Sequence, residues 1–193
     1  MQQIRGFIFD LDGTLVTSSL DFRLIKSEIG CPENEDILSF IEKLPVHLQQ
    51  SAHDVVHKHE LMDAHTSEWM PGANMFVQKC IEQNMPMAIV TRNSHQSSSV
   101  KIERNKIPID LLITRENSKP KPDPSALLYI ANMFSLETSE ILMVGDYRYD
   151  LEAGRNARMP ACLVHYDELP EYAHLADYSY PSFTELYRAK FSN

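Results

Sequence analysis

Five short apolar runs, separated by stretches of helical periodicity, constrain the fold of this chain more than any other feature. They span residues 4–9, 86–91, 109–114, 140–146 and 160–165. The first of them is β-branched and aromatic, which is typical of a strand buried on both faces, as in a parallel sheet. Strands that alternate with helices form doubly wound sheets. We therefore predict an α/β fold, a doubly wound Rossmann-like parallel sheet.

Helices are expected between these runs. One begins near Pro71-Gly72 and another at Pro122-Asp123-Pro124, because proline favours the first turn of a helix. Their apolar positions are Phe76, Val77, Cys80 and Ile81 in the first helix and Leu127, Leu128, Ile130 and Met133 in the second. A short strand over 178–180 and a helix from Ser182 are expected to complete the sheet.

Residues 17–70 contain no convincing strand and are expected to form an inserted helical module. Residues 20–30 and 34–44 predict two short helices, and residues 46–70 predict a longer third one. At 100° per residue the third helix has an apolar side. That side comprises Leu48, Ala52, Val55, Val56, Met62 and Trp69. The predicted division is a core of residues 1–16 and 71–193 and a helical module of residues 17–70.

Charge and cysteine content exclude several classes of protein. The chain has 18 basic and 27 acidic residues, a net charge of −9, and no basic cluster that could follow a phosphate backbone. No apolar stretch approaches the roughly 20 residues of a membrane span. Three widely spaced cysteines, Cys31, Cys80 and Cys162, indicate buried thiols rather than disulfides. We expect a cytoplasmic monomer or weak homodimer that binds neither nucleic acid nor membrane.

Polar residues follow four of the predicted strands, where each strand ends. In open α/β sheets, ligands bind beyond the carboxyl ends of the strands. The residues are Asp10 and Asp12 after the first strand, Thr91 after the second, Lys119 after the third, and Asp146 with Asp150 after the fourth. Clustered carboxylates repel one another unless a cation holds them, and Mg²⁺ is commonly shared between carboxylates and a substrate phosphate. The sequence therefore predicts a magnesium and phosphate site.

The same residues resemble the four motifs of the haloacid dehalogenase-like superfamily. The motifs are D-x-D-G-T at residues 10–14, Thr91 closing an apolar strand, K-P-x-P-D at residues 119–123, and G-D-x-x-x-D at residues 145–150. The insert resembles the small helical cap of the branch that contains phosphoglycolate phosphatases and β-phosphoglucomutases, and the ending "HLADYSYPSFTEL" resembles its closing strand and helix. The resemblance spans almost the whole chain.

The resemblance implies a role for each motif residue. Asp10 would be the nucleophile that forms an aspartyl-phosphate, and Asp12 the general acid and base. Mg²⁺ would be held by Asp10, Asp146 and the backbone carbonyl of Asp12, with Asp150 as a further ligand. Phosphoryl oxygens would be bound by Thr91, and Lys119 would steady the phosphate and the carboxylates. Contacts with the substrate or its phosphate are also expected from Thr14, Arg92 and Asn93.

Some assignments stay open at this point. Lys121 competes with Lys119 for the position of the active-site lysine, and Asn93 could instead cap the helix that follows it. His53, His57 and Glu60 share the face of the third helix opposite its apolar side. That face could bind a metal, line a cleft between module and core, or simply be solvated, and the last interpretation is favoured.

The function implied is a Mg²⁺-dependent phosphatase that hydrolyses a small phosphomonoester. The module has ten acidic and four basic residues, which disfavours a large polyanionic leaving group. A phosphomutase acting on a sugar phosphate would use the same residues. A phospho-accepting receiver-like switch is disfavoured because receivers have neither the second acid, Asp12, nor an inserted helical module.

Overall fold

The centre of the molecule is a six-stranded parallel sheet with the strand order β3-β2-β1-β4-β5-β6. The computed structural model describes residues 1 and 3–192. The strands are β1 (Gly6–Phe9), β2 (Met87–Val90), β3 (Leu111–Ile113), β4 (Ile141–Gly145), β5 (Ala161–Val164) and β6 (Tyr178–Tyr180). Each lies within the run predicted for it, so the α/β prediction is confirmed.

The register of the central strands brings the predicted site residues to one edge of the sheet. Phe9, at the end of β1, pairs with Ile89 of β2 and with Val144 of β4. Because these strands are parallel, their carboxyl ends lie side by side. The residues that follow β1, β2 and β4 therefore begin at the same level.

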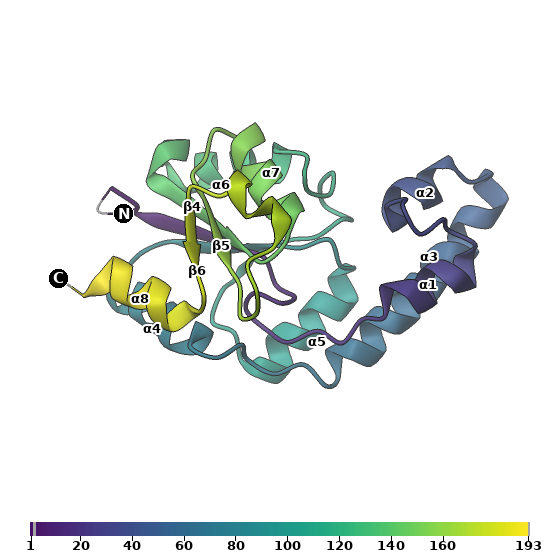
Figure 1. Ribbon diagram of the computed structural model, residues 1–193, viewed down its shortest axis with the longest axis horizontal. Coiled ribbons are helices and arrows are strands. Elements are labelled where there is room, and N and C mark those ends of the chain that lie inside the picture. The colour runs from purple at the N-terminus through teal and green to yellow at the C-terminus, as the bar shows by residue number, and fades with distance from the viewer. Residues whose placement is uncertain (2, 193) are drawn as a thin grey trace.

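Helices cover both faces of the sheet (Figure 1). They are α4 (Ala73–Glu82), α5 (His95–Asn105), α6 (Ser125–Phe134), α7 (Arg148–Asn156) and α8 (Phe183–Phe191), with 3₁₀ turns at Thr138–Glu140 and Glu171–Leu175. Phe76 of α4 and Phe183 of α8 pack on one face of the sheet, and Leu127 of α6 packs on the other. Both starts predicted from proline are confirmed, but three of the apolar positions named for these helices, Ile81, Leu128 and Met133, are exposed.

Three helices between β1 and α4 lie to one side of the sheet (Figure 1). They are α1 (Phe22–Ile29), α2 (Ile37–Lys43) and α3 (Val46–Ala64). Asp21 and Asp36 cap the first two, each accepting a hydrogen bond from the backbone N–H of the third residue of its helix. These helices share a small apolar cluster, to which Ile25, Ile41 and Val56 each contribute.

The prediction for the third helix is wrong in two respects. The helix ends at Ala64, six residues before the expected end, and Leu48 and Met62 are exposed. Trp69 lies outside it, where its indole N–H donates to the carbonyl of Asn105 at 2.7 Å. The reason is that the later part of α3 packs against α5 through polar side chains, so apolar periodicity does not mark its buried face.

The chain leaves the sheet for these helices and returns along adjacent segments. The backbone N–H of Thr17 donates to the carbonyl of Glu68 at 2.8 Å, and that of Met70 donates to Leu15 at 2.9 Å. An isolated bridge also joins Val16 to Trp69. We call residues 15–19 and 67–70 the junction.

The remaining expectations on cysteines and membranes can be compared with the structure. Cys31, Cys80 and Cys162 are buried free thiols, as predicted. Among residues 1 and 3–192, no helix combines the length and the apolar character needed to cross a membrane.

Candidate active site

Asp10 lies directly beyond β1 with a buried lysine against it. The Nζ of Lys121 donates to Oδ1 of Asp10 at 2.6 Å, to Oδ1 of Asp150 at 2.6 Å and to the carbonyl of Val90 at 2.7 Å. Although burial by itself lowers it, Asp10 and Asp150 raise the pKa of Lys121 above its usual value. Lys121 is therefore a fixed positive charge between two carboxylates.

The assignment of Lys119 as the active-site lysine is wrong, and its competitor Lys121 occupies that place. Lys119 is exposed, whereas the side chain of Lys121 is 2% exposed. The segment "KPKPDP" contains two overlapping K-P-x-P patterns, beginning at Lys119 and at Lys121. The lysine that contacts Asp10 is the second one, four residues before α6.

Asp146 and Asp150 follow β4 and lie near Asp10, Asp146 in the loop directly after the strand and Asp150 in the first turn of α7. Carboxylate oxygens of Asp10, Asp146 and Asp150 all lie within 4.8 Å of one another. Burial, together with Asp10 and Asp150, raises the pKa of Asp146 well above its usual value. Burial likewise raises the pKa of Asp150 to about 6, with Lys121 opposing the shift. Negative charge is concentrated here beyond what Lys121 neutralises.

Two small residues after Asp12 shape the space around Asp146. Thr14 is fully buried, and its hydroxyl donates to Oδ1 of Asp146 at 3.0 Å. It therefore orients a carboxylate of the acidic cluster, and its predicted contact with a substrate phosphate stays a prediction. Gly13 has φ +72°, and a Cβ there would collide with the Asp146 carboxylate.

These residues fit a bound magnesium ion. Mg²⁺ prefers oxygen ligands and is commonly bound through one or two carboxylates with several waters. Asp150 is already occupied, since Lys121 donates to Oδ1 and the backbone N–H of Tyr147 donates to Oδ2 at 3.0 Å. Within the described residues, no hydrogen bond reaches Oδ2 of Asp10 or Oδ2 of Asp146. Oδ2 of Asp146 is therefore the best available ligand, and Asp10 can add its Oδ1, which leaves Oδ2 of Asp10 open toward a substrate.

Asp12 points toward different partners from Asp10. Its Oδ1 accepts from the Nζ of Lys101, a short contact, and its Oδ2 accepts from the side-chain amide of Asn93 at 2.6 Å. Burial raises the pKa of Asp12 to about 6, although Lys101 lowers it. The side chain of Asp12 is thus held at both oxygens and lies outside the cluster formed by Asp10, Asp146 and Asp150.

Lys101, on α5, was not among the residues singled out from the sequence. Its side chain is fully buried, and its Nζ also donates to Oδ2 of Asp63 on α3 at 2.6 Å. A sequence clue did exist, because residues 95–105 have only two aliphatic side chains, Val100 and Ile102, so the packed face of this helix has to be polar.

Thr91, Arg92 and Asn93 follow β2 and have different surroundings. Thr91 is buried, and its hydroxyl accepts from the backbone N–H of Asn93 at 3.2 Å. Asn93 does not cap α5; Ser94 does, by accepting from the N–H of Ser97. Both predicted contact residues, Arg92 and Asn93, thus have protein partners.

Arg92 links the sheet to α2. Its Nη2 donates to Oδ2 of Asp36 at 2.5 Å, its Nη1 donates to the carbonyl of Lys121, and its guanidinium lies 4.4 Å from the ring centroid of Tyr149. Partial burial raises the pKa of Asp36, but Arg92 and the backbone N–H of Ser39 together hold it below its usual value. The N-terminus of α2 is therefore held against the loop after β2.

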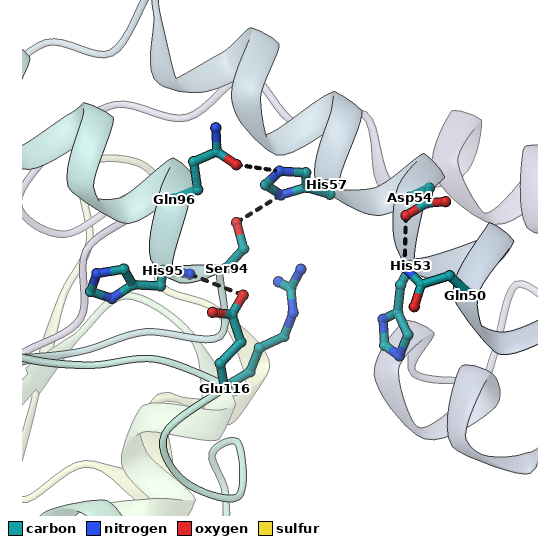
Figure 2. Close-up of a pocket in the computed structure, with 9 residues that line it drawn as sticks. Gln50, His53, Asp54, His57, Ser94, His95, Gln96 and Glu116 are labelled. Atoms are coloured by element: carbon teal, nitrogen blue, oxygen red, sulfur yellow. Dashed lines mark hydrogen bonds between the residues drawn. The ribbon is translucent and has the colours of Figure 1, made fainter.

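A pocket of about 560 Å³ lies between α3 and the loops after β2 and β3 (Figure 2). In it, His57 contacts the hydroxyl of Ser94 and the side-chain oxygen of Gln96, both at 3.0 Å. His53 points away from His57 (Figure 2). Among the described residues, the histidines join no group of potential metal ligands.

The polar face of α3 is a contact surface and not a solvated one, so the favoured interpretation of that face is wrong. Glu60 is 3% exposed and pairs with Arg115 from the loop after β3. Its Oε2 accepts from the backbone N–H of Ser94 at 3.1 Å and from Ser97 at 3.3 Å. A buried carboxylate with several donors indicates that α3 and α5 are docked through a defined polar interface.

Comparison with known proteins gives a consistent result. Residues 7–164 match the family model described as haloacid dehalogenase-like hydrolase. An uncharacterized hydrolase of Saccharomyces cerevisiae is 30% identical, covering 96% of this chain and 90% of its own length. A phosphoglycolate phosphatase of Chromobacterium violaceum is 25% identical over 97% of this chain and 96% of its own length. A hydrolase from Pseudomonas syringae shares the fold, with a TM-score of 0.80, 20% identity, and coverage of 96% and 97%.

Proposed function

This chain belongs to the haloacid dehalogenase-like hydrolase family and is an enzyme of its phosphatase superfamily, and we propose that it hydrolyses a small phosphomonoester with Mg²⁺ through an aspartyl-phosphate on Asp10. The relative named phosphoglycolate phosphatase supports a small substrate. The division into a core of residues 1–16 and 71–193 and a cap of residues 17–70 is part of the proposal.

The arrangement of Asp10 carries this proposal. Lys121 anchors Oδ1, while Oδ2 has no hydrogen-bond partner in the described part of the chain, and the side chain is 13% exposed. An oriented carboxylate with one free oxygen can attack phosphorus, and the resulting covalent intermediate divides one difficult displacement into two easier steps.

Asp12 is suited to move the protons of both steps. Its pKa of about 6 lies near neutral pH, where a general acid and base is most effective. It would protonate the leaving oxygen when Asp10 attacks, and then take a proton from the water that hydrolyses the intermediate. Asn93 and Lys101 hold its carboxylate for this purpose.

The remaining groups balance the negative charges of the carboxylates and of the phosphate. A magnesium ion held by Asp10 and Asp146, with Asp150 close by, would neutralise the phosphoryl oxygens and the carboxylates. Lys121 supplies a second positive charge at Asp10. Thr91, at the end of β2, would donate its hydroxyl to a phosphoryl oxygen.

The proposal is tested by release of inorganic phosphate from p-nitrophenyl phosphate with Mg²⁺, before and after chelation with EDTA. We expect turnover that EDTA abolishes, and an acid-stable phosphate label on the wild-type protein that is absent from Asp10→Asn. Asp110→Asn alters an exposed aspartate before β3 and should match the wild type. Undiminished turnover in Asp10→Asn would reject the mechanism.

A screen of sugar phosphates, phosphoglycolate and nucleoside monophosphates then identifies the substrate. Conversion of a sugar phosphate into its isomer without phosphate release would instead establish a phosphomutase.

A further inference from the structure

The geometry points to Lys101 as a positioning residue that fixes the carboxylate of Asp12, with Asp63 of α3 holding Lys101 in place. This inference rests on the proposed function, because it concerns the proton that Asp12 gives to the leaving group. It adds to that function a physical link between the proton donor and the junction through which the cap is attached.

Lys101 occupies a buried position, which is unusual for a lysine. Its side chain is fully buried, between Asp12 of the core and Asp63 of α3. Buried charges are tolerated only when they are paired and hydrogen-bonded. Burial alone would lower the pKa of Lys101, but the charges and hydrogen bonds of Asp12 and Asp63 outweigh burial and raise that pKa, so the ammonium group stays charged.

The two contacts of Asp12 restrict its side chain in a complementary way. Asn93 holds Oδ2 from the loop after β2, and Lys101 holds Oδ1 from α5. A carboxylate bound at both oxygens cannot rotate freely about its last side-chain bond. Displacement of a proton donor by about 1 Å lowers catalysis strongly, so this restriction matters for rate.

Asp63 connects this pair to the junction. Its Oδ1 accepts from the backbone N–H of Ser19 at 2.6 Å and from the Ser19 hydroxyl at 3.0 Å, and its Oδ2 accepts from Ser18 at 3.0 Å. Residues 18 and 19 belong to the segment that leads from the sheet into the cap. Lys101 is therefore correctly placed only when α3 and the junction are docked on α5.

A second ion pair between α3 and the core provides a matched control. Glu60 and Arg115 are similarly buried and also join α3 to the core, but neither contacts Asp12. Loss of this pair weakens docking of α3 without removing a ligand of the Asp12 carboxylate. A general effect of docking can thereby be separated from a specific effect on proton transfer.

The experiment compares kcat/KM for p-nitrophenyl phosphate and phenyl phosphate, which measures the reaction up to departure of the leaving group. Nitrophenolate leaves without a proton, whereas phenolate leaves far better when protonated. In Lys101→Met, kcat/KM for phenyl phosphate should fall about 100-fold, within the usual contribution of general acid catalysis, while the value for p-nitrophenyl phosphate changes little. Arg115→Met should lower both values by the same factor.

Lys101→Met leaves Asp63 buried without its cation, so a second variant is needed in case the first does not fold. The double variant Lys101→Met/Asp63→Asn removes both charges, and the asparagine oxygen can still accept from Ser19. It should show the same selective loss on phenyl phosphate. An equal loss on both substrates in the folded variants would overturn the positioning role, whereas a wild-type protein that releases phosphate from neither would reject the proposed function itself.

Discussion

Replacing Lys121 by methionine is the sharpest test of how the charges in this site are balanced. Methionine keeps much of the length and volume of lysine but removes the ammonium group that lies 2.6 Å from both Asp10 and Asp150. Breaking a buried ion pair from one side costs about 3–5 kcal/mol, because the remaining charge stays buried without compensation. With Lys121 only 2% exposed, solvent cannot replace it.

We therefore expect the free energy of unfolding of Lys121→Met, measured by urea denaturation with circular dichroism, to be about 3–5 kcal/mol lower than that of the wild type in the presence of EDTA. Mg²⁺ should recover part of this loss, because the carboxylates bind a cation more tightly once the ammonium charge is removed, and a cation bound only by the folded state stabilises it. The loss should also shrink at acidic pH, where the carboxylates can be protonated.

The matched control is Lys119→Met, two residues earlier. Lys119 is exposed, so its replacement should change the free energy of unfolding by no more than about 0.5 kcal/mol. Turnover of p-nitrophenyl phosphate should fall about 10²–10³-fold in Lys121→Met, the usual effect of removing one oriented electrostatic group. Equal losses in the two variants would refute the assignment of Lys121.

Two further predictions concern other parts of the structure. Gly30→Ala, at φ +70° with open space around it, should lower the free energy of unfolding only by the backbone strain, about 1–2 kcal/mol. Gly13→Ala should lower it further, because its Cβ also collides with the Asp146 carboxylate, and it should abolish turnover. For Asp36, whose folded-state pKa lies below 3.8, the ion pair with Arg92 stabilises the protein above about pH 4 and this contribution is lost as the pH falls through the folded-state pKa. Asp36→Asn keeps the helix cap but lacks the charge. Between pH 6 and pH 3 the free energy of unfolding, measured by urea denaturation, should therefore fall by about 1 kcal/mol less in Asp36→Asn than in the wild type, and an equal fall in both proteins would reject the ion pair.

The strands could be predicted to within two residues because their environment is simple. Strands buried on both faces need continuous apolar residues, and runs such as 86–91 contain little else. The strand ends then locate three site residues, because each directly follows a strand: Asp10, Thr91 and Asp146. Their position depends on the backbone register alone.

Lys121 and Lys101 could not be assigned in the same way. The choice between Lys119 and Lys121 depends on which side chain turns inward from a proline-rich loop, and both fit the motif. Lys101 is buried only because Asp12 and Asp63, distant in sequence, converge on it from two elements. Pairings of this kind depend on how α3 docks on α5, and hydrophobic periodicity contains no information about that.

The position of Trp69 has a practical consequence. It is the single tryptophan of the chain, it pairs with Val16 where the cap joins the sheet, and its indole N–H is bonded to α5. Its intrinsic fluorescence therefore originates at a place where a rotation of the three inserted helices relative to the sheet would change the surroundings of the indole. Stopped-flow emission of the unlabelled enzyme, mixed with Mg²⁺ and phosphate, can therefore test for such a rotation without an attached dye.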